Sequence, residues 1–152
     1  MAKGEFSPDQ AAQISRTSIK KLIVKYNDSK GQDKATLSMI IEQLARTPLY
    51  FAVQKGSDVS NAASIRFITL STGEQVFIPI FTDPDEFGKL KDSADVVCLQ
   101  PNQYFHMLVD NNCHAVINPF GSYFLMWPEL VRDYLLPFQV ETDALKEQKM
   151  NQ

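Results

Sequence analysis

The spacing of the apolar residues changes once along this chain, at Pro48. Before it, apolar residues recur three and four positions apart, as they do on one face of a helix; one series covers 19–26 and a second covers 37–45. The polar segment 27–33 between them contains a glycine, which favours a reversal of the chain. The sequence therefore predicts an N-terminal helix pair that ends before Pro48.

After Pro48 the apolar runs are short, as in β-strands. Residues 49–53, 65–70 and 76–81 form three such runs, and the segment 71–75 is predicted to be the connection of a hairpin. Pro79 lies inside the third run. Because proline has no N–H to donate, Pro79 predicts an edge strand or a bulge at this point.

Short helices then alternate with short strands. Asp83, Pro84 and Glu86 have the pattern of a helix start, with Asp83 as the cap and Glu86 reaching back to it. Further strands are predicted at 96–99 and 115–117, and further helices at 101–110 and 127–135. This order predicts an α+β or α/β fold, a single domain with a mixed β-sheet of about five strands flanked by helices.

The chain of 152 residues is long enough for one domain with a sizeable core. No linker divides it. We expect residues 1–35 to be a helical extension that packs on the core and residues 36–140 to be the α/β domain. Residues 141–152 are polar and are expected to form a tail.

Composition argues against several classes of function. The net charge of -3 gives no basic surface for nucleic acid or for anionic lipid. No run approaches the roughly 20 apolar residues that span a bilayer, and no signal-peptide pattern is present. Two cysteines are too few for a disulfide framework, so a cytoplasmic location is expected.

Residues suited to catalysis are few and dispersed. His106 and His114 are the only histidines, and the spacing between them and the cysteines matches no metal site. Cys113 and His114 are adjacent, and adjacent residues of a strand point to opposite faces, so the two cannot act as a nucleophile and its base. Cys98 lies within an apolar strand and is expected to be buried. We predict no catalytic residue, no metal site and no cofactor.

The segment 118–127 carries the strongest indication of function. Asn118, Pro119 and Gly121 suit the first, second and fourth positions of a type I turn, and the Asn118 side chain is expected to bond to the backbone two residues on. The residues after this turn are more apolar than those of most surface loops. They either form an interaction surface or cover one end of the sheet. The candidate contact residues are Phe120, Tyr123, Phe124 and Trp127.

Three motifs occur in a fixed order: LYFAV at 49–53, VFIPIFTD at 76–83 and AVINPFG at 115–121. In these motifs the chain resembles the SseB protein N-terminal domain family, the enhanced serine sensitivity type of bacteria, from about Ile40 to Pro137. Asp83 stands where this family more often has a small residue. The resemblance implies an α/β domain of bacterial, cytoplasmic origin and supplies no catalytic residues. The motif positions that we expect to be structural are Pro79, Thr82, Asp83, Asn118, Pro119 and Gly121.

These observations favour a non-enzymatic protein-interaction or regulatory module with its contact surface near residues 118–127. The expected partner is another protein, with a homo-oligomer as a further option, and neither nucleic acid nor a membrane is expected to bind. Two alternatives stay open. One is a domain that binds a small metabolite, and the other is an enzyme that uses Cys98 or Cys113 with a histidine.

Overall fold

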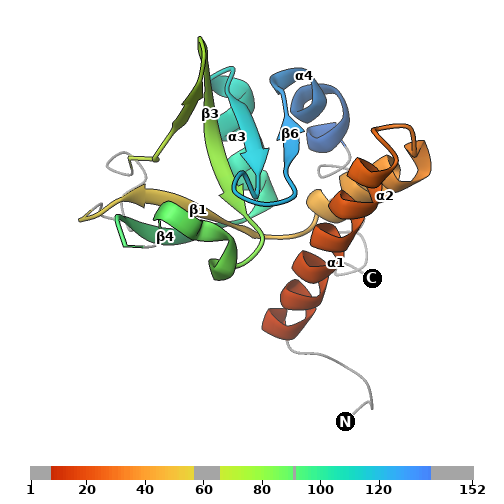
Figure 1. Cartoon of the computed structure of the whole chain (residues 1–152), viewed down its shortest axis with the longest axis horizontal. Helices are drawn as coiled ribbons and strands as arrows, with labels where there is room; N and C mark the ends of the chain where they lie inside the picture. The colour runs from red at the N-terminus through yellow and green to blue at the C-terminus, as the bar shows by residue number, and fades with distance from the viewer. Residues whose placement is uncertain (1–7, 57–65, 91, 138–152) are drawn as a thin grey trace, which may run out of the picture.

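The computed structural model describes residues 8–56, 66–90 and 92–137 of the chain (Figure 1). It is an α+β domain with one mixed sheet of six strands and an N-terminal helix pair, which confirms the predicted fold class. The helical elements are α1 (Pro8–Asp28), α2 (Lys34–Leu44), η2 (Pro84–Leu90), α3 (Pro101–Asp110), α4 (Pro128–Leu130) and η3 (Val131–Leu135). The strands are β1 (Leu49–Gln54), β2 (Leu70–Thr72), β3 (Gln75–Phe81), β4 (Ala94–Leu99), β5 (His114–Ile117) and β6 (Phe124–Met126).

The sheet has the strand order β4-β1-β3-β5-β6, and β2 pairs with the first half of β3. Among the described strands, β3 and β5 pair in parallel, with Ile80 opposite Ile117, and the other strand pairs are antiparallel. The chain passes from β3 through η2, β4 and α3 before it returns to β5. The two parallel strands therefore end at the same edge of the sheet.

One face of the sheet carries the main hydrophobic core. Alternate residues of β1, β3, β5 and β6 point into it, and α1, α2, α3 and η3 cover it. Ile19 and Ile23 of α1 are fully buried in this core, so the first helix is packed onto the sheet domain. The largest side chains of the core are Tyr104, Phe51, Phe105, Ile19, Ile23, Ile40, Leu44, Leu49, Ile80 and Leu108.

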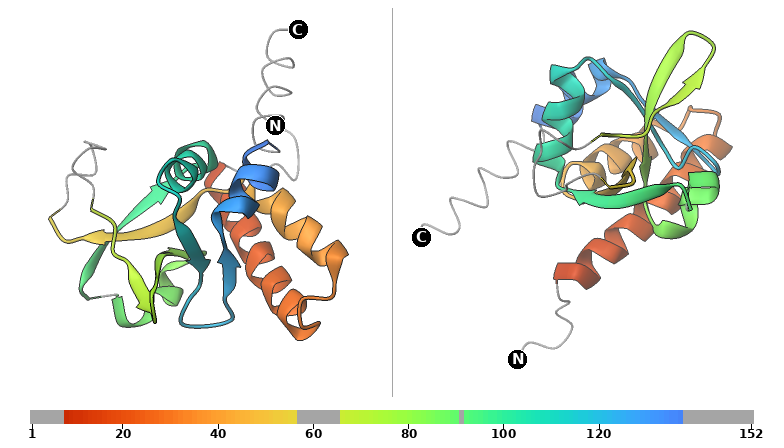
Figure 2. Two further views of the ribbon diagram at one scale, coloured as in Figure 1. Left: turned by 90° about the horizontal axis from the view of Figure 1, so that it is seen from above. Right: turned by 90° about the vertical axis from the view of Figure 1, so that its left-hand side faces the viewer.

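The opposite face of the sheet is covered only in part. Phe87 of η2 stacks on Phe81, and with Ala52 and Ala94 these rings form a second, smaller core. This second core lies over β1 and the end of β3. None of the described helices lies on the rest of this face, over β3, β5 and β6, and the β2–β3 hairpin projects from the body of the domain beside it (Figure 2).

The β2–β3 hairpin differs from the predicted one. Thr72 is opposite Gln75, so the connection is the two residues Gly73 and Glu74 rather than the segment 71–75. Of the predicted strand at 65–70, Phe67 makes an isolated bridge to Val53, and Leu70 begins β2. The first residue of that predicted strand lies outside the described residues.

Pro79 is buried within an internal strand, so the predicted edge position was wrong. On one side of β3, the pairing with β2 ends at Phe77 and the pairing with β1 begins at Ile80. Pro79 lies in the gap between these two partners. Its missing N–H therefore leaves no ladder bond unmade on that side, which is why an internal strand tolerates a proline here.

The final helix is present but is divided into α4 and a π-helical turn, η3. Leu130, Val131 and Leu135 of the predicted apolar face are buried, whereas Trp127 and Tyr134 are exposed. The predicted tail at 141–152 lies outside the described residues.

Tyr104 joins the end of α2 to the core. Its hydroxyl lies 3.3 Å from the carbonyl oxygens of both Leu44 and Thr47, to which it can donate. Burial raises the pKa of the Tyr104 phenol, so the group keeps its proton. Both carbonyls lie at the C-terminal end of α2, where the backbone supplies Leu44 O with one long hydrogen bond, from Thr47 N at 3.5 Å, so Tyr104 adds a donor at this helix end.

We predict that Tyr104→Phe lowers the free energy of unfolding by about 1–3 kcal/mol, because two buried carbonyl groups lose their shared donor. The measurement is chemical denaturation followed by circular dichroism. Tyr134→Phe is the matched control, since the Tyr134 side chain is exposed, and it is expected to stay within about 0.5 kcal/mol of the unmodified protein. Equal effects of the two substitutions would contradict this role of Tyr104.

Candidate functional site

The parallel strands β3 and β5 end side by side, and Asn118 joins their ends. Its Oδ1 accepts a hydrogen bond from the backbone N–H of Thr82 at 3.0 Å, and its Nδ2 donates to Thr82 Oγ1 at 3.0 Å. Both residues are buried. The Asn118 side chain therefore bonds across the sheet and not to the backbone two residues on, which corrects the prediction from the turn pattern.

Asn118 also begins the turn that follows β5. Its φ is 52°, in the left-handed region that asparagine adopts more readily than most residues. The backbone N–H of Gly121 donates to Asn118 O at 3.1 Å and closes the turn. One residue thus fixes the neighbouring strand through its side chain and the turn through its backbone.

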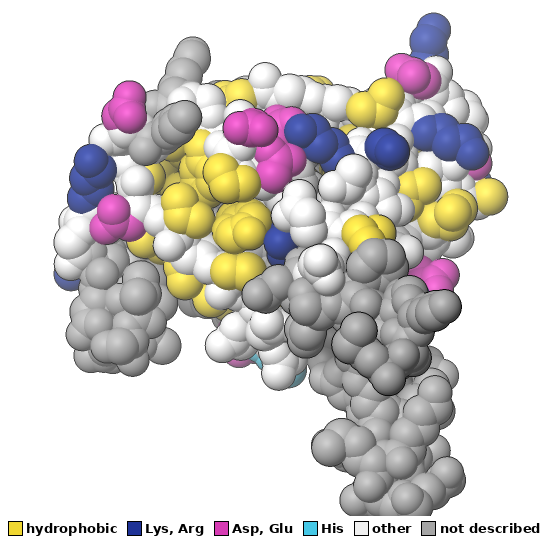
Figure 3. Space-filling view, turned by 90° about the horizontal axis from the view of Figure 1, so that it is seen from below, with side chains coloured by type: hydrophobic (Ala, Val, Ile, Leu, Met, Phe, Trp, Pro, Cys, Tyr) yellow, Lys and Arg dark blue, Asp and Glu magenta, His cyan; other side chains and the backbone are white. Residues whose placement is uncertain are grey.

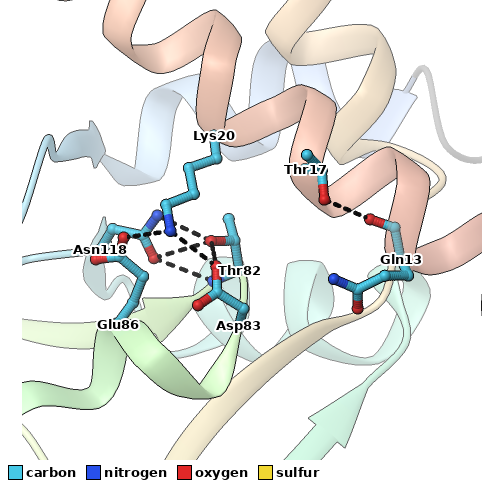
Figure 4. A network of polar contacts seen from close by, with 7 residues as sticks. All are labelled: Gln13, Thr17, Lys20, Thr82, Asp83, Glu86 and Asn118. Atoms are coloured by element: carbon cyan, nitrogen blue, oxygen red, sulfur yellow. Dashed lines mark hydrogen bonds and ion pairs between the residues drawn. The ribbon is translucent and has the colours of Figure 1, made fainter.

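Lys20 of α1 reaches the same edge of the sheet. Its Nζ lies 3.1 Å from Asp83 Oδ2 and 2.8 Å from Glu86 Oε1 (Figure 4). Thr82 Oγ1 in turn donates to Asp83 Oδ2 at 3.1 Å. We refer to Lys20, Thr82, Asp83, Glu86 and Asn118 as the polar cluster. It ties α1 to the ends of both parallel strands.

The polar cluster corrects two predictions. Asp83 and Glu86 were expected to cap a helix, but both carboxylates bind Lys20 instead. Nothing in the sequence predicted that Lys20 has a partner 63 residues away. The hydrogen bond to Glu86, together with Asp83, raises the pKa of the Lys20 amine above its ordinary value. The cation is therefore retained at neutral pH.

Two glycines allow the turn to approach η2 closely. A Cβ atom at Gly121 would lie 2.9 Å from Glu86 Oε2, so any side chain there would displace a member of the polar cluster. Gly88 has a φ of 50°, and a Cβ atom on it would lie 3.1 Å from the ring of Phe120. The Phe120 ring therefore packs on the backbone of η2, and it also stacks near Phe81 at 6.4 Å between centroids.

Beyond this turn, the uncovered part of the sheet forms an apolar groove of 530 Å³. We define the apolar groove by its lining residues, which are Leu70, Ser71, Thr72, Phe77, Val116, Pro119, Phe120, Tyr123 and Leu125. None of these side chains is charged. The hairpin residues of β2 and β3 form one wall, and the segment between β5 and β6 forms the other.

The four candidate contact residues separate into two groups. Phe120, Tyr123 and Trp127 are 40%, 53% and 47% exposed. Phe124 is 5% exposed and packs in the main core with its ring edge against Tyr26, so it is not one of the exposed contact residues. The reason is strand alternation in β6, which turns Phe124 and Met126 inward and Leu125 outward. Leu125, which sequence reasoning missed, is 38% exposed and lines the groove.

A second hollow, of 370 Å³, follows the outer edge of β6. We refer to it as the edge groove, and its lining residues are Tyr26, Asn27, Lys34, Leu37, Tyr123, Phe124, Leu125, Trp127 and Leu130. The α1–α2 turn forms its far side. Asn27 Nδ2 donates to the carbonyl oxygen of Tyr123 at 2.9 Å and to Ser122 Oγ at 3.1 Å across one end of the hollow.

A third apolar surface lies over β1 and β4. Tyr50 and Cys98 are opposite each other on the face away from the main core, and Val96 next to them is exposed. Figure 3 shows hydrophobic side chains gathered on this side of the molecule beside acidic and basic groups. Arg16 is buried there, with its guanidinium 4.9 Å from the Tyr50 ring centre. Cys98 was expected to be buried, but strand alternation places it on this outer face.

The cysteines and histidines do not assemble a catalytic pair among the described residues. Partial burial raises the pKa of both the Cys98 and the Cys113 thiol, which lowers the thiolate fraction. Cys113 Sγ lies 3.7 Å from the carbonyl oxygen of Asn111, and His114 Nδ1 lies 2.9 Å from Gln75 Nε2. Cys113 and His114 therefore each have a partner other than the imidazole or thiol that catalysis would need.

Within the part of the chain that the structure describes, no three His, Cys, Asp or Glu side chains come close enough together to hold a metal ion. In the same residues, no helix has both the length and the apolar character needed to cross a membrane.

The comparison with protein families agrees with the three motifs that surround the polar cluster. The model of the SseB protein N-terminal domain matches residues 20–133. The chain belongs to this family. The match begins at Lys20, within α1, so it includes every member of the polar cluster in this SseB domain. Neither a curated protein nor a solved structure matches the chain.

We predict that Asn118→Ala destabilises this SseB domain more than Asn118→Gly does. Both substitutions leave the buried N–H of Thr82 without its acceptor, at a cost of about 1–3 kcal/mol. Alanine in addition has to adopt a positive φ, which costs about 1–2 kcal/mol more, while glycine adopts it freely. Urea denaturation of the two variants measures the difference, and equal stability would show that the left-handed conformation carries no cost here.

Lys20→Met is expected to lower stability by about 1 kcal/mol, a value that allows for the 41% exposure of the Lys20 side chain. The loss arises because Asp83 and Glu86 keep their negative charges without the cation. Lys21→Met is the matched control, since Lys21 is exposed on the same helix and makes no ion pair with a described residue. Denaturation at low and high salt should show a difference that shrinks with salt. The same loss in both variants would contradict the ion pair.

Proposed function

We propose that this SseB domain is a non-enzymatic protein-interaction module whose contact surface is the apolar groove. The observation that carries the proposal is the uncovered sheet face, on which Phe120, Tyr123 and Leu125 are together exposed beside buried apolar strand residues. Exposed contiguous apolar surface with aromatic side chains is characteristic of protein-binding sites. Exposed apolar residues that are scattered singly would not support the proposal. Phe120, Tyr123 and Leu125 support it because all three line the apolar groove.

The groove has the rigidity of a binding surface. The Phe120 ring rests on Gly88 and near Phe81, and its turn is held by Asn118 through the polar cluster. Tyr123 is held through its carbonyl group by Asn27. Because these contacts exist before any partner binds, the Phe120 ring and the backbone of this wall lose little conformational entropy when they are covered.

The lining of the groove favours a protein over a small polar metabolite. An amino acid ligand brings an amino and a carboxylate group, which bind best to charged or multiply hydrogen-bonding side chains. The groove offers only the hydroxyl groups of Ser71, Thr72 and Tyr123. An apolar partner side chain fits this lining better than a charged ligand does.

The double substitution Phe120→Ser and Tyr123→Ser should abolish partner binding while the domain stays folded. Affinity purification from the source organism, followed by quantitative mass spectrometry, compares this variant with the unmodified domain. Tyr134→Ser is the matched control, because Tyr134 is an exposed tyrosine on η3 and does not line the groove. A set of captured proteins that survives the double substitution, with unchanged circular dichroism, would overturn the proposed surface.

The alternative of a cysteine-dependent enzyme predicts a reactive thiolate near neutral pH. With the pKa of both thiols raised by burial, we expect iodoacetamide to alkylate Cys98 and Cys113 more slowly than a free cysteine at pH 7. The rates should rise as pH increases past the ordinary thiol pKa, since the thiolate then forms. Mass spectrometry with Cys98→Ser and Cys113→Ser assigns each rate. Rapid alkylation at pH 7 would favour the enzyme instead.

A further inference from the structure

We propose that the outer edge of β6 binds an extended peptide segment of the partner by strand addition. The segment would lie in the edge groove, continue the sheet beyond β6, and carry an acidic residue opposite Lys34. This inference rests on the proposed function, because Tyr123 and Leu125 line both the apolar groove and the edge groove. To the proposed function it adds the conformation of the bound partner segment, which is extended, and its charge, which is negative.

The β6 strand ends the sheet, and its outward backbone groups are identified by the bonding of β5. Asn118 N donates to Ile80 O, so the backbone groups of Asn118, and of Val116 two residues before it, face β3. Those of Ala115 and Ile117 consequently face β6. Val116 is opposite Leu125 in the register, so this pair exchanges no hydrogen bond, and the N–H and C=O of Leu125 point outward.

The contact from Asn27 supports the same assignment independently. Asn27 lies on α1, outside the edge of β6, and its Nδ2 donates to Tyr123 O at 2.9 Å. Because residues two apart in a strand direct their backbone groups to the same side, Tyr123 and Leu125 share the outer edge. The Asn27 amide occupies the place that a donor from an added strand would take at Tyr123. Leu125 is the next outward position along the edge.

The form of the edge groove selects a single extended segment as its occupant. Tyr26 and Asn27 of α1 and Lys34 and Leu37 of α2 line the groove beyond β6, so the helix pair extends past the end of the sheet (Figures 1 and 2). A second copy of the domain, paired through its own β6, would bring its own helix pair into the same space. A lone strand has no such helices and fits between Leu125 and the α1–α2 turn.

The charge of the groove indicates the chemistry of that segment. Lys34 is the one charged residue among those that line the edge groove. No carboxylate of a described residue lies within ion-pair distance of it. Lys34 also begins α2, whose N-terminal end adds partial positive charge. The remaining lining is largely apolar, so the fitting sequence alternates apolar residues with others and includes Asp or Glu.

The test uses a phage-displayed library of random linear peptides, selected on the immobilised full-length protein. Selected peptides are synthesised, and their affinities are measured for Leu125→Pro and Leu125→Ala. Both substitutions remove the leucine side chain, but only proline removes the outward N–H, and neither touches the groups of Phe124 and Met126 that face β5. We expect proline to weaken binding about tenfold relative to alanine, the effect of one lost hydrogen bond in a desolvated edge.

If Leu125→Pro does not fold, a second measurement tests strand addition on the unmodified protein. Peptides with single N-methylated residues are titrated against the unmodified protein. Methylation of the N–H that donates to Leu125 O should abolish binding, while methylation of the two neighbouring N–H groups, which face away from β6, should not. Lys34→Glu should select peptides with basic in place of acidic residues. Lys30→Glu, on the same turn but outside the groove lining, should leave the selected motif unchanged.

The outcomes separate this inference from the proposed function. Peptides that bind Leu125→Pro and Leu125→Ala equally, yet lose affinity with Phe120→Ser, would overturn strand addition and leave the apolar groove as the contact surface. Binding that is indifferent to all of these substitutions would overturn both. Selection of helical peptides, recognised by loss of binding on N-methylation at consecutive interior positions, would likewise reject an extended occupant.

Discussion

The parallel pairing of β3 with β5 is the constraint on which the rest of this domain depends. Parallel neighbours end at the same edge, so the residues that follow them, Thr82 and Asn118, meet there. Their buried backbone groups require partners, and Asn118 supplies one from its side chain while its left-handed backbone turns the chain toward β6. Lys20 then fastens the first helix to that edge.

The candidate binding surface follows from this arrangement and from the limited reach of the helices. Most of the helical residues cover one face of the sheet, and η2 covers only the end of the other near Phe81. The turn after β5 therefore emerges beside an open face, with Phe120 leaning on η2 and Tyr123 beyond it. The same residues that finish the fold also place aromatic side chains in solvent, so the fold and the candidate contact surface share one cause.

Periodicity predicted the elements of this fold well because it depends on local spacing. The helix pair, the mixed sheet and the turn at Asn118 were all evident from short segments of sequence. The partner of Lys20 was not, because ion pairing across 63 residues depends on the tertiary path of the chain. Phe124 was predicted to be a contact residue and Leu125 was missed for a related reason. A run of apolar residues does not show which of its side chains face the core. The register of β6 with β5 determines which side chains point inward.

The proline in β3 has a consequence for how the two walls of the groove are supported. Because β3 changes neighbours around Pro79, the β2 wall of the groove pairs with β3 alone, while the Phe120 wall is anchored to two strands and two helical segments. The Phe120 wall thus has more contacts with the rest of the domain than the β2 wall has. The groove therefore lies between a wall that is built into the main fold and a wall that is built from one hairpin, whose entry is held by the bridge of Phe67 to Val53.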